Sequence, residues 1–257
     1  MPESKYSIDG RREVKFSPYI SLKYERYKRM YKDKRIIALI PARGGSVGVK
    51  RKNIREFCGK PLIYWTIEAS KKSKYIDEIY VSTEDEEIKN ISLFYGSKVL
   101  DRPKSLAENN SHIKDVMKYH IEELGLGDND LLILLNPTSP IRISNGINII
   151  DYCIEQFDYE NKDQAASVYM CQHYPYGTSA SANRQELSAY PYDNGSVYIN
   201  KVEHLKDGIY WVDNPDRRQA IVVPEIFNYE IDTEIDFIMV ESLMKYLQFK
   251  EYENVQF

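Results

Sequence analysis

The residues with the clearest chemical potential lie directly after a short apolar run. Ile36–Ile40 is followed by the segment Pro41–Ser46, which contains Arg43 and an adjacent pair of glycines, and Lys52 comes soon after. Two adjacent glycines let the backbone turn sharply and point successive N–H groups at one place, which makes a binding site for an anion such as phosphate. Arg43 and Lys52 would add positive charge to it. The alternative is a turn that only connects two elements of the fold.

The spacing of these glycines excludes two familiar nucleotide sites. The chain has no G-x-x-x-x-G-K-[ST] motif, and no G-x-G-x-x-G opens the helix that is expected next. Neither a P-loop NTPase nor a dinucleotide-binding Rossmann site is therefore predicted. If the apolar run is the first strand of an α/β sheet, the glycine turn lies at its carboxyl end, where such sheets bind ligands.

A second group of residues could hold a metal ion. Glu230-Ile231-Asp232 places two carboxylates at positions i and i+2, which share one face of an extended segment. This spacing suits a hard cation such as Mg²⁺, which takes oxygen ligands and leaves positions for phosphate oxygens. Attack on an α-phosphorus needs cations and aligned donors, because negative charge builds up on the phosphate oxygens. The alternative is an acidic loop exposed to solvent.

Alternating apolar segments supply the elements that must position these residues. Short continuous apolar runs predict strands, and segments with apolar residues on one side predict helices. Up to residue 156 the order is strand 36–40, helix 62–72, strand 79–82, helix 86–95, strand 98–100, helix 112–124, strand 131–135 and helix 145–156. This order predicts an α/β fold with a mostly parallel sheet covered by helices on both faces.

The pattern is looser after Asp163. Strands are predicted at 165–169, 195–199 and 220–223, followed by a closing helix at 235–247. The segment 172–194 is longer than a connection in a compact domain needs to be, and loops of that length usually carry a binding site or a subunit contact. We therefore predict an insertion there.

Composition narrows the class of protein. The chain has 257 residues, of which 42% are hydrophobic and 29% charged, as in globular proteins. No apolar run approaches the roughly 20 residues that cross a bilayer, and the N-terminus lacks a signal-like apolar core, so we expect a soluble protein without a membrane span. Three widely spaced cysteines, Cys58, Cys153 and Cys171, fit neither a disulfide framework nor a zinc site and favour a cytoplasmic location.

Charge is unevenly distributed along the chain. Residues 1–35 contain 11 Lys and Arg against 5 Asp and Glu, whereas residues 36–257 contain 24 against 34. We therefore separate a basic, aromatic N-terminal extension at 1–35 from a main domain at 36–257. Basic residues among aromatics can bind nucleic acid, but Tyr24, Tyr27 and Tyr31 follow helical spacing. A short amphipathic helix packed on the body or on a partner chain is favoured, and nucleic-acid binding is not expected.

Six segments carry a resemblance to a known family: IPARGGS with RKN, GKPLIYWTIEASKKSKYIDEIYVSTEDEEI, DRPKSLA, LLNPTSPIR, NGSVYIN and EIDTEIDF. They occur in order between Ile36 and Leu247 and look like those of the acylneuraminate cytidylyltransferases, which make CMP-sialic acid and related CMP-nonulosonic acids. The resemblance implies a Rossmann-like nucleotidyltransferase domain with a small dimerisation insertion. It also implies transfer of CMP from CTP to the anomeric hydroxyl of a nine-carbon 2-keto acid, with magnesium and with release of pyrophosphate.

The resemblance also assigns roles to individual residues. It implies catalysis by Arg43, Lys52 and Asp232, and a magnesium site at Glu230 and Asp232. The nucleotide phosphates and ribose are implied to bind Ala42, Arg43, Gly44, Gly45, Ser46, Lys52 and Asn53, with Arg102 at or near the cytosine. Acceptor contacts are implied for Asn136, Arg184 and Gln185. An arginine suits the sugar carboxylate, because a guanidinium can bind it through two hydrogen bonds.

The sequence departs from the family pattern at five positions. Val47 stands where a phosphate-facing lysine is usual, Glu230 replaces the first metal aspartate, and Asn136 replaces a glutamine. Ile113 lies near an expected Ser or Thr, and Tyr192 near an expected second arginine. The changes from Asp to Glu and from Gln to Asn keep the functional group and alter its reach. Val47 has a larger effect, because it removes a positive charge beside a triphosphate.

Three explanations of this loss are open: Lys50 or Arg51 supplies the charge, the enzyme is slow, or its substrate differs. Two hypotheses of different classes remain for the chain. In the first it is an active cytidylyltransferase for a sialic, legionaminic or pseudaminic type of acid, or for a different acidic acceptor, and it feeds surface glycan synthesis. In the second it is a non-catalytic or repurposed homologue that binds a nucleotide or a partner. For the active enzyme we expect a homodimer in which the insertion of one chain helps to form the acceptor pocket of the other.

Overall fold

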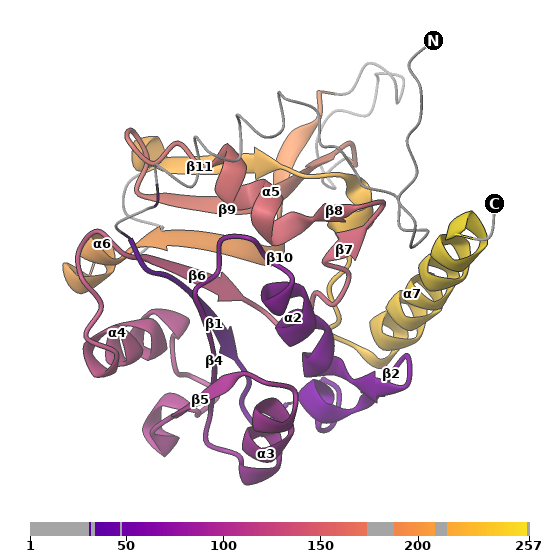
Figure 1. Ribbon diagram of the computed structural model, residues 1–257, viewed down its shortest axis with the longest axis horizontal. Helices are drawn as coiled ribbons and strands as arrows, with labels where there is room; N and C mark the ends of the chain where they lie inside the picture. The colour runs from indigo at the N-terminus through magenta and orange to yellow at the C-terminus, as the bar shows by residue number, and fades with distance from the viewer. Residues whose placement is uncertain (1–30, 32–33, 47, 174–187, 209–214, 256–257) are drawn as a thin grey trace, which may run out of the picture. The chain divides into compact units, whose positions relative to one another are not determined.

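The computed structural model describes residues 31, 34–46, 48–173, 188–208 and 215–255 (Figure 1). The chain divides into two compact units, residues 1–34 and 35–257, and everything below concerns the second. Nearly all of the predicted N-terminal extension lies outside the described residues, and so do Val47, Arg184, Gln185 and most of the predicted insertion. The extension, the insertion and the boundary between domains therefore stay predictions.

A seven-stranded sheet forms the centre of this unit. Its spatial order is β11-β9-β10-β6-β1-β4-β5. The strands are β1 (Ile36–Pro41), β4 (Glu78–Thr83), β5 (Lys98–Asp101), β6 (Leu131–Leu135), β9 (Gln164–Cys171), β10 (Tyr190–Lys201) and β11 (Arg218–Val222). Among these strands only β10 runs against its neighbours, β6 and β9, while the other pairs are parallel. The prediction of a mostly parallel sheet is confirmed.

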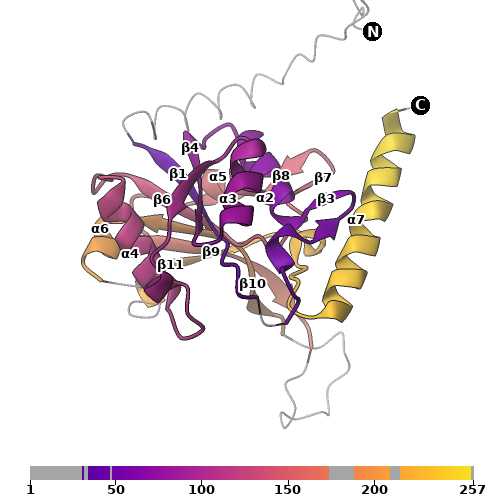
Figure 2. The same ribbon diagram turned by 90° about the horizontal axis from the view of Figure 1, so that it is seen from below.

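Helices cover both faces of the sheet. They are α2 (Leu62–Lys71), α3 (Glu86–Phe94), α4 (Ile113–Glu123), α5 (Ile149–Gln156), α6 (Val202–Lys206) and α7 (Glu234–Val255). Ile37 and Leu39 of β1 belong to a core cluster with Met117 and Ile121 of α4 and Leu205 of α6. The alternate residues of β1 point to the other face, because successive side chains of a strand alternate. Figures 1 and 2 show α4 beside α6, apart from α2 and α3.

The continuous apolar runs form the two most buried strands for a physical reason. All five residues of β6 and the first five residues of β1 are buried. A parallel strand with helices on both sides has no face left for solvent, so its sequence shows an unbroken apolar run instead of alternation. In the part of the chain that the structure describes, no helix is long and apolar enough to cross a membrane.

One predicted helix begins later than expected. The helix predicted at 145–156 starts at Ile149, because residues before it form a hairpin of β7 (Ile143–Ser144) and β8 (Ile147–Asn148). Asn145 has a φ of 51° and Gly146 a φ of 74°, which is a left-handed pair that turns a hairpin and cannot begin a helix. The Asn148 side chain then accepts a hydrogen bond from the Ile150 N–H and caps the helix.

Several smaller elements and longer ends also differ from the prediction. The hairpin of β2 (Glu56–Phe57) and β3 (Lys60–Pro61) was not predicted, β10 starts at Tyr190 instead of residue 195, and α7 continues past residue 247. Single turns of 3₁₀ helix occur at η1 (Lys52–Ile54), η2 (Lys104–Leu106), η4 (Pro215–Arg217) and η5 (Glu225–Phe227). Of these, η1 and η2 contribute residues to the site described next.

Candidate active site

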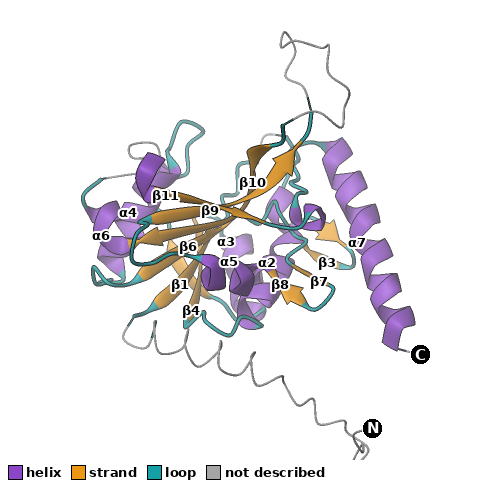
Figure 3. Ribbon diagram, turned by 90° about the horizontal axis from the view of Figure 1, so that it is seen from above, coloured by secondary structure: helices purple, strands orange, loops and turns teal. Residues whose placement is uncertain are grey.

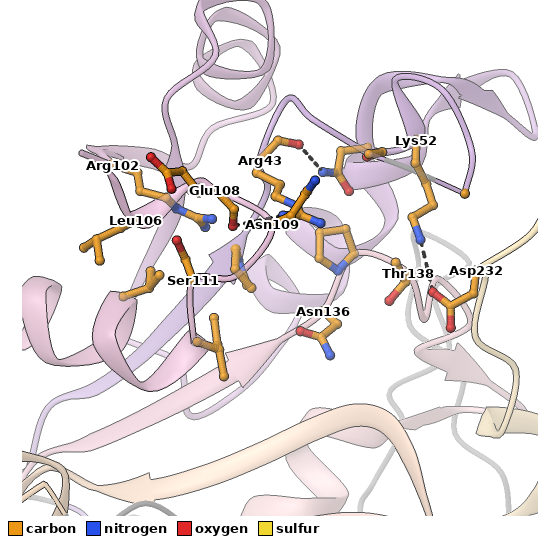
Figure 4. A pocket seen from close by; sticks show the side chains of 17 residues that line it. Arg43, Lys52, Arg102, Leu106, Glu108, Asn109, Ser111, Asn136, Thr138 and Asp232 are labelled. Atoms are coloured by element: carbon orange, nitrogen blue, oxygen red, sulfur yellow. Dashed lines mark hydrogen bonds and ion pairs between the residues drawn. The ribbon is translucent and has the colours of Figure 1, made fainter. Parts of the chain in front are cut away.

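A cleft of about 450 Å³ opens at the carboxyl ends of β1, β5 and β6. It is the place where ligands bind in open α/β sheets. Side chains that the sequence analysis placed in separate motifs line it together: Arg43, Ser46, Lys52, Asn53, Arg102, Asn136 and Asp232. Figure 4 shows Arg102 and Lys52 on opposite sides, with Arg43 between them.

The glycine loop after β1 is tied down on one side and open on the other. The Gly44 N–H donates to a Glu84 carboxylate oxygen at 2.8 Å, and a Cβ on Gly44 would lie 2.6 Å from the Asp85 carboxylate. In contrast, a Cβ on Gly45 would meet nothing within 4 Å. The backbone at Gly45 is therefore exposed and unobstructed, while the N–H of Gly44 already has a partner, and neither glycine is among the residues that line the cleft. Ala42 is fully buried and supports the loop from below.

Two arginines, Arg43 and Arg102, line the cleft. Arg43 donates from Nη1 to the Glu108 carbonyl at 3.2 Å, and its own carbonyl accepts a hydrogen bond from Asn53 Nδ2 at 3.0 Å. Arg102 is only 7% exposed. Burial lowers the pKa of Arg102 to about 10, Glu84 raises it in part, and the positive charge of Arg43 lowers it further. Two guanidinium groups near each other favour a ligand with several negative charges.

Lys52 connects this loop to the acidic segment near the C-terminal helix. Its Nζ donates to the Ile231 carbonyl at 2.7 Å and lies 3.2 Å from an Asp232 carboxylate oxygen. The Asp232 side chain is 71% exposed, so the ion pair adds little to stability. Its effect is to bring a predicted catalytic cation and a predicted metal ligand to the same side of the cleft, as Figure 4 shows.

Glu230 and Asp232 have different surroundings although one residue separates them. The Glu230 carboxylate accepts a hydrogen bond from Thr138 Oγ1 at 2.8 Å, and a Cβ on Gly195 would lie 2.5 Å from its other oxygen. Burial raises the pKa of Glu230, the Thr138 hydrogen bond opposes this, and the negative charge of Asp232 reinforces it. Glu230 therefore faces the protein, whereas Asp232 faces the cleft.

Carboxylates such as Glu230 and Asp232 are suitable ligands for a hard cation, although only Asp232 lines the cleft. Carboxylate oxygens are the ligands that Mg²⁺ prefers, usually with water and substrate phosphates in the remaining positions. No group of three or more His, Cys, Asp or Glu side chains that could hold a metal occurs within the described ranges. A cation here would need ligands from a bound phosphate or water, which is the usual arrangement for Mg²⁺ with a nucleotide.

Asn136 forms part of the wall of the cleft at the end of β6. Its side chain donates from Nδ2 to the Gly195 carbonyl at 3.0 Å, which joins β6 to β10. Below it lies Arg142, which is 1% exposed and donates to the Asn136 carbonyl at 2.6 Å. Arg142 also donates to the Ser196 carbonyl at 3.0 Å and to Thr66 Oγ1 at 3.1 Å. Burial lowers the pKa of Arg142 to about 9.

Sequence reasoning missed the residues that hold the site from behind. Glu84 and Asp85 contact the glycine loop, and Thr138 contacts Glu230. Arg142 instead contacts Asn136, Ser196 and Thr66. No spacing rule singled these residues out. Arg142 lies inside the LLNPTSPIR segment, but nothing in that polar, proline-containing pattern indicates that it is buried.

The positions that depart from the family pattern can be placed in part. Arg51 pairs with Asp85 and Glu87 of α3, and these contacts raise its pKa. It therefore faces the start of α3 in this structure, and its role as a substitute cation for position 47 stays a prediction. Ile113 lines the cleft, and Tyr192 is 54% exposed, with its ring 5.5 Å from that of Tyr169.

Comparison with known proteins identifies the family. Residues 37–135 match a family model described as cytidylyltransferase. The post-translational flagellin modification protein B of Campylobacter coli is 32% identical over 230 residues, which cover 82% of this chain and 95% of that protein. The chain belongs to the cytidylyltransferase family.

Other relatives differ in how much of their length is matched. An N-acylneuraminate cytidylyltransferase of Streptococcus agalactiae serotype III (strain NEM316) is 30% identical over 222 residues, which cover 79% of this chain and 52% of the relative. A pseudaminic acid cytidylyltransferase of Campylobacter jejuni is 28% identical over 232 residues, which cover 81% of this chain and 96% of the relative. The chain thus spans about half the length of the streptococcal enzyme.

A solved structure supports the fold. A CMP:2-keto-3-deoxy-manno-octonic acid synthetase complexed with CTP has a TM-score of 0.61 to this chain and 14% sequence identity. The alignment covers 83% of this chain and 99% of that structure. At this identity the likeness shows the fold alone, and it confirms the predicted nucleotidyltransferase architecture.

Proposed function

We propose that this protein transfers CMP from CTP to the anomeric hydroxyl of an acidic 2-keto sugar of the sialic, legionaminic or pseudaminic type and releases pyrophosphate. The observation that carries the proposal is the common cleft of Arg43, Lys52, Arg102 and Asp232, which come from four separate segments. A site with three cations and an exposed carboxylate suits a triphosphate with a divalent metal. The names of the relatives add that the acceptors in this family include acidic 2-keto sugars.

In this proposal the chain's own groups bind the triphosphate. Arg43 and Lys52 hold phosphate oxygens, the backbone at Gly45 lies against a phosphate, and Arg102 binds at or near the cytosine. Attack by the sugar hydroxyl oxygen forms a bond to the α-phosphorus and breaks the bond between that phosphorus and the leaving pyrophosphate, and the hydroxyl proton passes to water. Fixed cations lower the barrier, because they meet the negative charge that develops on the phosphate oxygens.

Asp232 and Glu230 would hold magnesium in this reaction. A bound Mg²⁺ supplies charge neutralisation for the phosphate oxygens. Asp232 contributes an exposed carboxylate, and Glu230 contributes from its niche beside Thr138. Lys52, which touches Asp232, orients that carboxylate.

The acceptor contacts and the assembly are part of the same proposal. Asn136 lines the cleft and would contact the sugar, and Arg184 and Gln185 would bind its carboxylate. We place the enzyme in the cytoplasm, as its three widely spaced cysteines favour. We also propose a homodimer, because β9 and β10 continue as a two-stranded ribbon next to the predicted insertion, as Figure 3 shows. Such a ribbon gains stability by pairing with a second copy.

The decisive experiment is a pyrophosphate-release assay with four NTPs crossed with a panel of 2-keto sugar acids. We expect release with CTP and with at least one nine-carbon acid, and no release when either substrate is left out. Calorimetric titration with each NTP measures binding separately from turnover. Binding of CTP without release by any acid would support the repurposed homologue and overturn the proposal.

A further inference from the structure

A line of buried hydrogen bonds runs from Arg102 in the cleft to helix α4. Arg102 donates from Nε to Ser82 Oγ at 2.9 Å and from Nη2 to the Ser82 carbonyl at 2.9 Å. Ser82 Oγ lies 2.7 Å from His120 Nε2, and His120 Nδ1 lies 2.9 Å from a Glu123 carboxylate oxygen. Ser82 and His120 are 0% exposed, whereas 40% of the Glu123 side chain is exposed. Two residues that do not line the cleft therefore connect a cleft arginine to the protein surface.

The two ends of this line set the direction of its hydrogen bonds. A guanidinium can only donate, so Ser82 Oγ accepts from Arg102, and a carboxylate can only accept, so His120 Nδ1 donates to Glu123. In neutral His120 the unprotonated Nε2 then accepts the Ser82 hydroxyl hydrogen. This order of hydrogen bonds corresponds to the neutral Nδ1–H form of His120.

A second proton on His120 would disturb this order. Nε2 would become a donor, both lone pairs of Ser82 Oγ would be occupied, and the hydroxyl hydrogen would lose its acceptor. Burial lowers the pKa of His120, Glu123 raises it in part, and Arg102 lowers it further. The charged groups that face this line are Glu123 from α4, with Arg102, Glu84 and Arg43 from the sheet side.

Three N–H groups of the Arg102 guanidinium remain for a ligand. Ser82 uses Nε and one N–H of Nη2, which leaves the second N–H of Nη2 and both of Nη1, for which no hydrogen-bond partner occurs in the described parts of the chain. Arg102 lines the cleft, and Figure 4 shows its guanidinium turned toward the other lining residues. Ser82 thus holds the guanidinium through two hydrogen bonds and leaves its other N–H groups for a ligand in the cleft.

We propose that His120 is a positioning residue for nucleotide binding: by accepting the Ser82 hydroxyl hydrogen, it keeps Ser82 Oγ as the acceptor that orients Arg102. This inference rests on the proposed function, because the ligand of Arg102 is taken to be CTP. His120 does not touch the nucleotide. It acts through Ser82, and the neutral His120 is the form that supports binding.

The first test compares three variants by calorimetric titration with CTP at pH 7.5. His120→Leu keeps an apolar filling in the core but removes the acceptor, and we expect CTP to bind about tenfold more weakly, with a higher KM for CTP and a smaller change in kcat. His120→Gln can accept through Oε1 and should bind within about threefold of wild type. Tyr119→Phe, on the same helix and 39% exposed, is the control and should bind within about twofold. Unchanged affinity in His120→Leu overturns the inference.

A pH series tests the protonation requirement. As the pH falls from 7.5 through the lowered pKa of His120, the CTP affinity of the wild type should fall more steeply than that of His120→Gln, since only the histidine gains a proton. The phosphates of CTP also titrate in this range, so the difference between the two proteins is the result that counts. Parallel pH profiles contradict the proposal.

The tautomer can be read directly in the wild type, which keeps the proposal testable if His120→Leu fails to fold. Nitrogen-15 histidine spectra, assigned with His120→Gln, should show Nδ1 protonated and Nε2 unprotonated at pH 7.5. An Nε2–H tautomer or an imidazolium overturns the hydrogen-bond order. A wild type that does not bind CTP overturns the proposed function and this inference together. A wild type that binds CTP, with His120→Leu unchanged, overturns this inference alone.

Discussion

Glu230 and Asp232 are separated by one residue, yet their carboxylates have different surroundings. Ile231 between them is fully buried, and its N–H donates to the Thr138 carbonyl, which fixes the backbone of the segment. The Asp232 side chain is exposed to the cleft, where a ligand can reach it, while the Glu230 carboxylate packs closely against Gly195. The two side chains should therefore respond differently to the same neutral substitution.

At the exposed position, Asp232→Asn should lower turnover at least about 100-fold without changing thermal stability. A neutral amide is a poor ligand for a hard cation, and the ion pair with Lys52 contributes little. Pyrophosphate release across a magnesium series measures the effect. Glu234→Gln, an exposed neighbour that pairs with Arg55, is the matched control and should keep its activity. Near-normal turnover of Asp232→Asn at saturating magnesium would remove the metal role.

At the buried position, Glu230→Gln should increase the free energy of unfolding by about 1 kcal/mol at pH 7.5 while lowering turnover. Because the pKa of Glu230 is raised in the folded protein, its charged form is less favourable there than in the unfolded chain. This destabilising effect of the charged Glu230 is present at pH values above the pKa of the group in the unfolded chain, and it disappears as the pH falls below that pKa. Urea titrations should thus show a gain at pH 7.5 that shrinks toward pH 4.5. A loss of stability at pH 7.5 would mean that the carboxylate is stabilising.

Of the three glycines in the loop between β1 and η1, Gly48 is tightly packed and Gly45 is open. A Cβ on Gly48 would lie 2.1 Å from the Asp232 carbonyl, whereas one on Gly45 would meet nothing within 4 Å. Gly48→Ala should therefore push the two segments apart and cost about 2 kcal/mol in stability. Gly45→Ala should leave stability within about 0.5 kcal/mol but weaken CTP binding about tenfold, because its methyl group fills the space for a phosphate.

Thermal melting and CTP titration of this pair separate the two effects. Normal CTP affinity in Gly45→Ala would show that the phosphates bind elsewhere. Equal stability of the two variants would show that the close approach of Gly48 to Asp232 has no energetic consequence.

Arg142 joins three elements, α2, β6 and β10, through one buried guanidinium. Arg142→Lys should lower the free energy of unfolding by about 3 kcal/mol, because an ammonium cannot match the fork geometry and leaves buried acceptors without partners. Urea denaturation measures the loss. Arg55→Lys, whose guanidinium forms a partly exposed pair with Glu234, is the control and should change by less than about 0.5 kcal/mol. A loss below about 1 kcal/mol for Arg142→Lys would contradict the bracing role.

The sequence correctly predicted the strands whose residues form short, continuous apolar runs. The apolar runs at Ile36 and Leu131 form β1 and β6, and the glycine turn follows the carboxyl end of β1 as expected. The start of α5 was wrong because turn chemistry at Asn145 overrides helical periodicity. Arg142 was missed because its charge is satisfied by carbonyls and hydroxyls from distant segments, and no spacing in the sequence records such contacts.

At the scale of the whole molecule, the ribbon of β9 and β10 predicts assembly. Met170 is 42% exposed on one face of this ribbon and Tyr192 54% exposed on the other, so a variant at both positions tests both faces. Light scattering should give a mass near twice 30.1 kDa at micromolar concentration. The double variant Met170→Lys with Tyr192→Lys should be a monomer with reduced turnover, since charges on a buried interface oppose pairing. Phe94→Lys on α3, where Phe94 is 82% exposed, is the control. A fully active wild-type monomer would contradict the shared pocket.

The strand order has a consequence for synthesis of the chain. β10 lies between β6 and β9, although β9 is made first, so β9 has no place in the sheet until β10 has emerged from the ribosome. From residue 135 to residue 201 the edge of β6 is unpaired, for roughly 3–13 s at ordinary elongation rates. An unpaired apolar edge can recruit another nascent chain. Lys52 meets Ile231 only after 179 further residues, so the cleft is completed only once residue 231 has been made. Slow codons after β10 would lengthen the time before activity without lengthening the time during which the edge of β6 is unpaired.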